Sequence, residues 1–169
     1  IKGPANVWVV GDCYKINPAD GTVYNAFVKG DDYKYKNFVW DVGEKTISLA
    51  GAKNEYLAFQ IIVEAREDLS GINVIKSDLK GPSTIPADNI GLFKEHYVNV
   101  DKEAGWPQPS TGTGEYPDAL IPMEHPRKGA PFNIKRGRNQ AIWADLYIPQ
   151  EAEAGEYTGV FSVIGDRKS

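Results

Sequence analysis

The feature that most constrains this sequence is a hydrophobic alternation with a period of two residues. In the stretch EYLAFQIIVEA (55–65), it puts four large apolar side chains on one face of an extended chain: Leu57, Phe59, Ile61 and Val63. The stretch AIWADLYIP (141–149) alternates in the same way, and Pro149 ends it because proline has no N–H for a ladder. Such alternation is typical of strands with one face against a core, so both stretches are predicted to be central strands.

Shorter segments with the same pattern recur along the chain, separated by turn signals such as Asp20-Gly21 and Gly81-Pro82. The longest is GEYTGVFSVIG (155–165), and the others are NVWVVG, TVYNAFV, NFVWDVG, KTISLAG, GINVIKSDL and IGLFKEHYVNV. Helical spacing is not seen in any long window, and the best helical candidate is a 3₁₀ turn at Pro86–Asn89. Many short strands without crossover helices predict an all-β fold, an antiparallel two-sheet β-sandwich (Ig-like or jelly-roll-like) of about eight to ten strands.

Size and composition limit the classes of protein to which the chain can belong. A length of 169 residues suits a single β-sandwich domain over 1–169, and 41% hydrophobic with 25% charged residues indicates a chain that folds. The formal net charge of -4, without a basic stripe, argues against nucleic acid as a partner. Apolar runs are far shorter than the ~20 residues that cross a bilayer, so no membrane span is predicted.

One segment, at about 101–138, breaks the rhythm of short strands and polar turns. It is rich in proline and glycine, and structureless loops of this length are uncommon in compact domains unless they are functional, self-packed or disordered. Its aromatic and apolar content argues against disorder. We therefore predict one long, ordered Pro/Gly-rich loop that packs against another surface. Its apolar stretch GEYPDALIPMEHP (114–126) is the part least suited to exposure to water.

Patterns of catalytic and metal-binding residues are not found. His96 and His125 stand far apart, and a single cysteine, Cys13, does not match the usual structural zinc sets. The adjacent acids Asp31-Asp32 and Glu67-Asp68 lie beside turn residues and are predicted to be solvated. Calcium is the alternative there, but no Asp-x-Asp-x-Asp-Gly run is present. The prediction is a chain without catalytic residues, metal site or cofactor.

Aromatic residues provide the candidate binding site, because sugar rings stack their C–H faces on exposed aromatic rings. Several aromatic residues cluster in DDYKYKNFVW (31–40), and others lie on the long loop. The candidate carbohydrate-binding residues are Trp106, Tyr116, Tyr33, Tyr35 and Trp40. For tryptophans in predicted strands, such as Trp40, packing in the core or on a sheet face is the alternative interpretation.

Five segments in order resemble the N-terminal β-sandwich domain of glycoside hydrolase family 123 and related bacterial glycoside-hydrolase-like proteins. They are NEYLAFQIIVEA, SDLKG, IPADNIGLFKEHYVNV, GEYPDALIP and NQAIWADLYIPQEAEAGEYTGVFSV. The resemblance extends from about Trp8 to Val163. Its most specific parts are Asn54-Glu55, the run from Pro117 to Leu120, and the stretch from Trp143 to Gly159.

The resemblance implies a function that depends on a second domain. In that family the sandwich precedes a (β/α)₈ barrel, whose adjacent Asp-Glu pair acts on N-acetyl-β-galactosaminides. A barrel needs roughly 250 residues and alternating helices, which this sequence lacks, so the catalytic pair has no position here. The implied function is a non-catalytic accessory domain of a bacterial carbohydrate-processing protein, packing against a following barrel in an N-acetyl-β-galactosaminidase-like parent. Export to the periplasm, cell surface or medium is implied in the same way.

The same resemblance suggests a docking role for part of the long loop. The expected interface residues are Tyr116, Pro117, Asp118, Leu120, Ile121 and Pro122. The prolines would hold an extended shape, Leu120 and Ile121 would be buried against the barrel, and Asp118 would accept backbone N–H bonds. The alternative is that this loop packs on its own sandwich.

Two other functions stay open at this point. The chain could be an independent carbohydrate-binding module, in which case the isolated chain would bind sugar and lose that binding with Trp106→Ala. It could instead be a structural sandwich domain of a cell-surface protein, for which calcium-dependent stability would be the clue.

Overall fold

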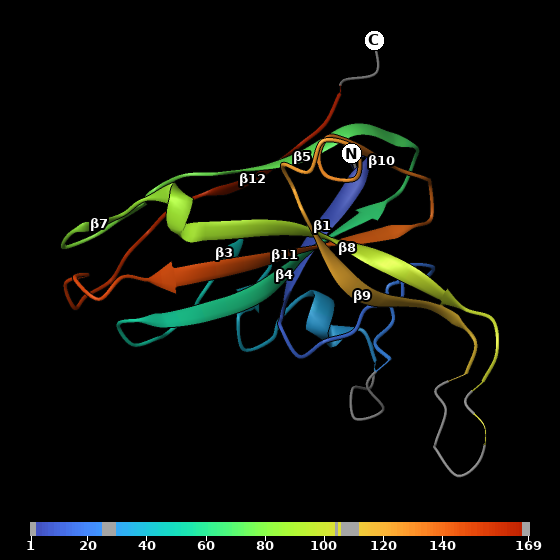
Figure 1. The fold of residues 1–169 in the computed structure, drawn as a ribbon, viewed down its shortest axis with the longest axis horizontal. Helices are drawn as coiled ribbons and strands as arrows, with labels where there is room; N and C mark the ends of the chain where they lie inside the picture. The colour runs from blue at the N-terminus through green and yellow to red at the C-terminus, as the bar shows by residue number, and fades with distance from the viewer. Residues whose placement is uncertain (1–2, 25–29, 104, 106–111, 167–169) are drawn as a thin grey trace.

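The computed structural model describes residues 3–24, 30–103, 105 and 112–166. Within them the chain forms β-strands and two short 3₁₀ helices, arranged as two larger antiparallel sheets and two small hairpins (Figure 1). This arrangement confirms the predicted all-β, sandwich-like fold. Among the described residues, no helix has the length and hydrophobicity that a membrane span requires.

The larger sheet has five strands in the order β1-β4-β11-β8-β9, and every neighbouring pair is antiparallel. Its strands are β1 (Ala5–Gly11), β4 (Glu55–Ala65), β8 (Ile90–Val100), β9 (Gly114–Pro122) and β11 (Asn139–Ile148). The two predicted central strands are β4 and β11, and they pair with each other continuously. The alternation therefore identified the centre of the fold correctly.

The smaller sheet has three strands in the order β10-β5-β12. Its strands are β5 (Leu69–Lys76), β10 (Phe132–Ile134) and β12 (Phe161–Ile164). The hairpins pair β2 (Trp40–Asp41) with β3 (Thr46–Ile47) and β6 (Leu79–Lys80) with β7 (Thr84–Ile85). The 3₁₀ helices are η1 (Asp32–Lys34) and η2 (Ala87–Asn89), and η2 confirms the turn expected at Pro86–Asn89.

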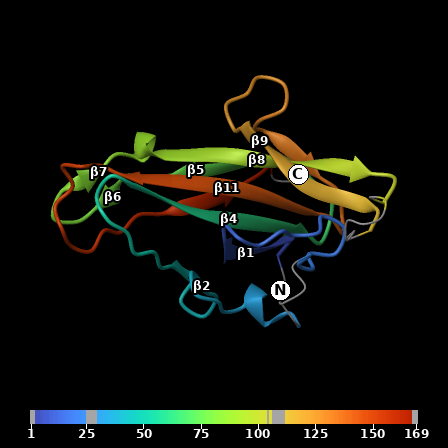
Figure 2. The same cartoon turned by 60° about the horizontal axis from the view of Figure 1, so that its bottom comes forward.

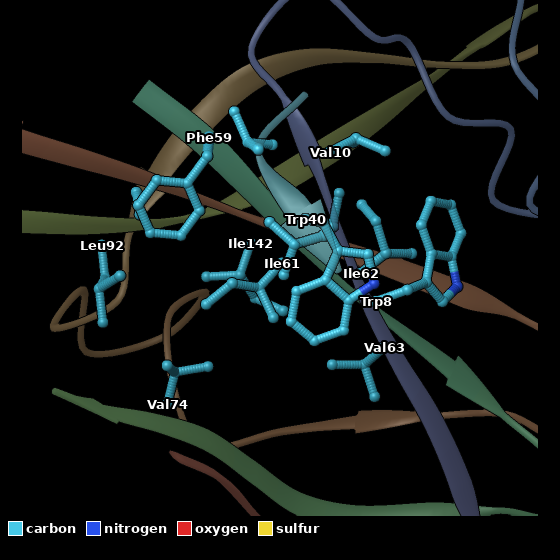
Figure 3. Close-up of a cluster of buried hydrophobic side chains, with 14 of the residues drawn as sticks. Trp8, Val10, Trp40, Phe59, Ile61, Ile62, Val63, Val74, Leu92 and Ile142 are labelled. Carbon is cyan, nitrogen blue, oxygen red and sulfur yellow. The ribbon is translucent and has the colours of Figure 1, made fainter. Parts of the chain in front are cut away.

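The main core lies between the two sheets. Its inward-facing side chains come from alternate positions of the strands: Phe59, Ile61, Val63, Val74, Leu92 and Ile142 (Figure 3). Phe59 of the larger sheet meets Phe161 of the smaller one edge to face, with ring centroids 5.4 Å apart. The period-two pattern in the sequence corresponds to the burial of alternate residues in this core.

A second layer of packing covers part of the opposite, outer face of the larger sheet. We name residues 12–24 and 30–50 the covering segment. With η1 and β2, they lie on the side of the sheet near β1 and β4 (Figure 2). Trp8, on the outer face of β1, is only 1% exposed and meets Tyr33 of η1 in a T-shaped contact with ring centroids 5.7 Å apart. This segment therefore turns half of the outer face into core.

Polar side chains attach the covering segment to the sheet. Gln60 points outward from β4 and donates from Nε2 to three backbone carbonyls, those of Gly11, Asp12 and Tyr14. Asn37 donates from Nδ2 to the carbonyl of Val9 at 2.8 Å. Because β1 is the first strand in the sheet order, this bond also satisfies part of an otherwise open edge.

The predicted long loop at about 101–138 was wrong in one respect, because it contains strands β9 and β10. Pro117 and Pro122 led to the loop interpretation, yet both lie in β9 and pair with Tyr97 and Phe93. Since β9 is the last strand of its sheet, one of its edges has no neighbouring strand. A missing proline N–H costs little when it faces that edge.

Three predicted strands also differ in extent. The stretch 155–165 forms a strand only at Phe161–Ile164, and the segments NFVWDVG and KTISLAG shorten to the two-residue strands β2 and β3. Most of TVYNAFV lies outside the described residues. In β12 the alternation still holds, since Phe161 and Val163 are half-buried while Ser162 and Ile164 are exposed.

Candidate functional site

The uncovered half of the larger sheet's outer face carries a hollow that the covering segment does not reach. Register fixes its composition, because directly paired residues share a face. On this face Tyr147 pairs with Tyr56, and Asp145 pairs with both Ala58 and Gly91. One step further along, Trp143 pairs with both Gln60 and Phe93. A row of small side chains around Asp145 therefore lies between two rows that carry aromatic rings.

The hollow is an open depression of about 290 Å³. We name it the outer-face hollow, and its lining residues are Tyr56, Asp88, Asn89, Gly91, Phe93, Asp145 and Tyr147. They come from β4, η2, β8 and β11, three of them neighbouring strands of one sheet. A volume near the lower end of the ~300–1,000 Å³ typical of small-molecule sites suits one small ligand or part of a larger one.

Hydrogen bonds fix the side chains around this hollow. Trp143 donates from its indole Nε1 to Oδ1 of Asp145 at 2.6 Å, which orients the carboxylate at the centre. Tyr147 donates from its hydroxyl to Oδ1 of Asn54 at 2.8 Å, and its ring lies 4.9 Å from that of Tyr56. Tyr56 itself is 68% exposed. The site therefore combines an exposed ring with a positioned acceptor.

Glycine at position 91 leaves room for the Phe93 ring at the side of the hollow. A Cβ built at Gly91 would come within 2.9 Å of the Phe93 ring and 3.8 Å of Cβ of Asp145. The Phe93 ring thus leans over the backbone of Gly91. A larger residue here would have to displace the ring, so the absence of a side chain contributes to the shape of the site.

The residues predicted from the sequence as a sugar platform do not assemble into one surface. Tyr33 and Trp40 are 6% and 8% exposed, and both belong to the packing between the covering segment and the sheet. Tyr33 donates from its hydroxyl to the carbonyl of Gly21, and Trp40 donates from Nε1 to the carbonyl of Lys34. Buried rings have no free face, so these two expectations are corrected: Tyr33 and Trp40 are core residues.

The other three predicted platform residues have different surroundings. Tyr35 is 59% exposed, just after η1, and stays a candidate on exposure alone. Tyr116 lies in β9 and stacks on Tyr24, with ring centroids 4.5 Å apart. Trp106 lies outside the described residues.

The predicted docking segment, Tyr116 to Pro122, is strand β9. Tyr24 supports it by donating from its hydroxyl to the carbonyl of Glu115 at 2.8 Å, and Arg138 pairs with the Glu115 carboxylate at 2.7 Å. Leu120 is 38% exposed and Ile121 is half-buried. The strand therefore presents a supported edge with a few apolar side chains.

Asp118 does not have the role that the sequence suggested. It sits where the β8–β9 register shifts, opposite the step from His96 to Tyr97, and its side chain is exposed. From the described part of the chain, it accepts no backbone hydrogen bond. Pairing with β8, rather than capping by Asp118, holds this segment in its extended shape.

A larger recess of about 900 Å³ opens between the two sheets at one end of the sandwich. Its inner wall is formed by core side chains, including Phe59, Ile85 and Leu146, and its rim by parts of 45–53 and 152–159. This recess is the open end of the core. The outer-face hollow, by contrast, is lined by side chains that point away from the core.

One buried and one half-buried ionisable group lie in the covered half of the outer face. Glu95 of β8 is 5% exposed, and burial raises the pKa of its carboxyl to about 7, with Lys15 acting in the opposite direction. Tyr97 accepts a hydrogen bond from the backbone N–H of Ala141 at 2.9 Å, and burial raises the pKa of its hydroxyl. Neither residue lines the outer-face hollow or the larger recess.

Metal ligands do not gather in the structure as described. Within residues 3–24, 30–103, 105 and 112–166, no three His, Cys, Asp or Glu side chains are grouped for an ion. His125 instead accepts hydrogen bonds at Nδ1 from the backbone N–H groups of Arg127 and Lys128, which stabilises a turn.

The residues of the outer-face hollow were not among the predicted site residues. In the sequence, Tyr56, Trp143 and Tyr147 occupy the positions of the two predicted central strands that point away from the core. The signal that could have found them is the pairing of those two strands, because aromatic residues directly opposite each other in an antiparallel pair lie on the same face. Register, however, comes from the turns and the partner strands and not from either strand alone.

Comparison with known proteins identifies the domain. A family profile described as the glycoside hydrolase 123 N-terminal domain matches residues 31–165. The chain belongs to this family. The matched range includes η1, the β2–β3 hairpin and every residue of the outer-face hollow, whereas β1 precedes it.

A solved structure supports the fold of this family 123 N-terminal domain. It is a family 123 glycoside hydrolase from Clostridium perfringens, described in a study of glycolipid glycan hydrolysis, and it superimposes with a TM-score of 0.71 at 15% identity. The match covers 99% of this chain and 25% of that one, so the chain spans about a quarter of its length. At this identity the likeness concerns the fold alone. No curated protein matches the chain.

Proposed function

We propose that this family 123 N-terminal domain is a non-catalytic accessory domain that packs against a following catalytic barrel. The observation that carries the proposal is the family match over 31–165 to a domain described as N-terminal. The structural match supports it, because the whole chain corresponds to a quarter of a solved glycoside hydrolase. The parent protein, an exported enzyme of the N-acetyl-β-galactosaminidase type, would supply the catalytic carboxylates.

Strand β9 is the proposed docking surface. It is the last strand of the larger sheet. The Tyr24–Tyr116 stack and the Arg138–Glu115 ion pair connect it to other parts of the chain. Leu120 projects from it with 38% exposure. An edge strand on a rigid support provides a preordered contact surface, so docking costs little conformational entropy.

The test compares two substitutions in the protein that contains both domains. Leu120→Asp puts a charge in the proposed contact, whereas Val42→Asp changes a residue of equal exposure, 38%, in the β2–β3 hairpin region. We expect Leu120→Asp alone to split thermal unfolding into separate domain transitions and to lower activity on an N-acetyl-β-galactosaminide. A two-domain protein that unfolds and reacts as before with Leu120→Asp would refute docking through β9.

A second function, carbohydrate binding by this domain itself, is favoured by one specific observation, the outer-face hollow. That possibility does not depend on a barrel.

A further inference from the structure

The outer-face hollow has the organisation of a binding site rather than of an incidental depression. Along β11, outward-facing residues at 143, 145 and 147 give one ring, one carboxylate and another ring. Strands rise about 3.3 Å per residue, so the Cα atoms of Trp143 and Tyr147 stand about 13 Å apart with Asp145 midway. On both sides of Asp145 the paired residues, Ala58 and Gly91, are small. The Phe93 ring leans over Gly91, so the floor is low on the Ala58 side of the acceptor, and the walls are aromatic.

The walls and the acceptor are held in place before any ligand arrives. Asp145 is fixed by the indole N–H of Trp143, and Tyr147 is fixed by Asn54. The second oxygen of Asp145 is not used by the Trp143 bond, which involves Oδ1. Groups fixed in advance lose little entropy on binding, which favours affinity at a small site.

The chemistry of the lining restricts the ligand. Asp145 and Asp88 give the site two carboxylates, so an anion such as a phosphate ester would be repelled. The amide of Asn89 can donate and accept, while carboxylates accept from hydroxyl groups. Aromatic rings at the rim offer flat apolar faces. The set suits a neutral ligand with an apolar face and several hydroxyl groups along its edge.

We propose that the outer-face hollow binds a neutral saccharide. One sugar ring lies across the low central row, with its hydroxyl groups directed at the Asp145 carboxylate and the Asn89 amide. The C–H face of the sugar packs on Tyr56, whose ring is the most accessible of the lining aromatics at 68% exposure. This proposal requires no second domain, so it stands or falls separately from docking through β9.

The experiment titrates the 169-residue chain with methyl glycosides of galactose, N-acetylgalactosamine and glucose, and with short oligosaccharides of each. Binding is followed by NMR through the Trp143 indole Nε1–H signal, which reports on the bond to Asp145. We expect the signal to shift for at least one sugar, with an affinity in the range of about millimolar typical of a single shallow contact.

Three variants and a matched control make the result specific. Tyr56→Ala removes the exposed ring, Asp145→Asn removes the charged acceptor, and Ala58→Gln fills the low row without deleting a contact. Each is expected to weaken binding about tenfold, the scale of one aromatic or hydrogen-bonding contact. Phe38→Ala removes an aromatic side chain of similar exposure, 72%, elsewhere on the surface and should leave binding unchanged.

Asp145→Asn alters a side chain that is hydrogen-bonded to Trp143, so it can disturb the fold. Ala58→Gln and Tyr56→Ala leave that bond in place and keep the test valid in that case. The absence of a shift with every sugar at high millimolar concentration, in a folded sample, would overturn the proposal. So would binding that Phe38→Ala abolishes and Tyr56→Ala does not. A shift with choline but with no sugar would also overturn it, because rings and carboxylates can instead hold a quaternary ammonium group.

Discussion

The two halves of the larger sheet's outer face are built from the same strands and have different fates. In the half next to β1, the outward residues Trp8 and Ile62 are 1% and 0% exposed, because the covering segment (12–24 and 30–50) packs over them. In the half next to η2, Tyr56 is exposed and Tyr147 and Asp145 are half-buried. The covered half is a second core, and the open half is a surface with a hollow.

The difference shows that the position of a side chain on a strand does not determine its role. β4 contributes Tyr56 to the open half and Ile62 to the covered half from the same face. Burial is decided by what lies above the sheet. Substitutions in the covered half should therefore act on stability, and those in the open half on binding.

The largest effect is expected for Trp8→Ala in the covered half. Removing this fully buried ring loses its contact with Tyr33 and leaves a cavity, so the free energy of unfolding should fall by about 3–5 kcal/mol. Urea denaturation followed by circular dichroism measures it. A loss below about 1 kcal/mol would mean that the covering segment does not pack on the sheet in solution.

Glu95→Gln should raise stability at neutral pH. The pKa of Glu95 is about 7 in the folded chain and near its ordinary value of 4.5 when unfolded. Both states are protonated below the unfolded pKa, and stability is then lost as pH rises toward the folded pKa. Glutamine removes this loss, so the variant should gain up to about 3 kcal/mol near pH 8 and nothing near pH 4. Unfolding curves at both pH values test it, and an equal gain at both would refute it.

An intermediate effect is expected for Gln60→Leu. The change leaves the carbonyls of Gly11, Asp12 and Tyr14 without their shared donor, at a cost of about 1–3 kcal/mol. Compared with the unsubstituted chain, amide hydrogen exchange that speeds up more in 12–24 than in β11 would show that the covering segment loosens first. Unchanged exchange in that segment would show that Gln60 does not hold it.

The smallest effect on stability is expected for Tyr56→Ala in the open half. Its ring contacts Tyr147 across the strands, and such a pair contributes about 0.2–1 kcal/mol. The same urea denaturation used for Trp8→Ala gives the comparison. A loss as large as that of Trp8→Ala would remove the distinction between the two halves.

Much of the fold could be predicted because alternation reports directly on burial. β4, β8 and β11 were found with nearly their observed bounds, since each has one face in the core. β9 was missed because its prolines are tolerated only at a sheet edge, and a sequence does not say which strand is last. Tyr33 and Trp40 were predicted as a platform because local clustering of aromatics says nothing about what covers them.

The sequence by itself determined the β-sandwich, its central strands and, through ordered segments, the resemblance to the family 123 N-terminal domain. These are properties of local periodicity and of residue order, both of which can be read along one chain. Only the tertiary structure decided that the covering segment (12–24 and 30–50) lies over one half of the outer face, and that Tyr56, Asp145 and Tyr147 meet in the other. The physical reason is that strand register and layer contacts are set by residues far apart in sequence, which no single segment encodes.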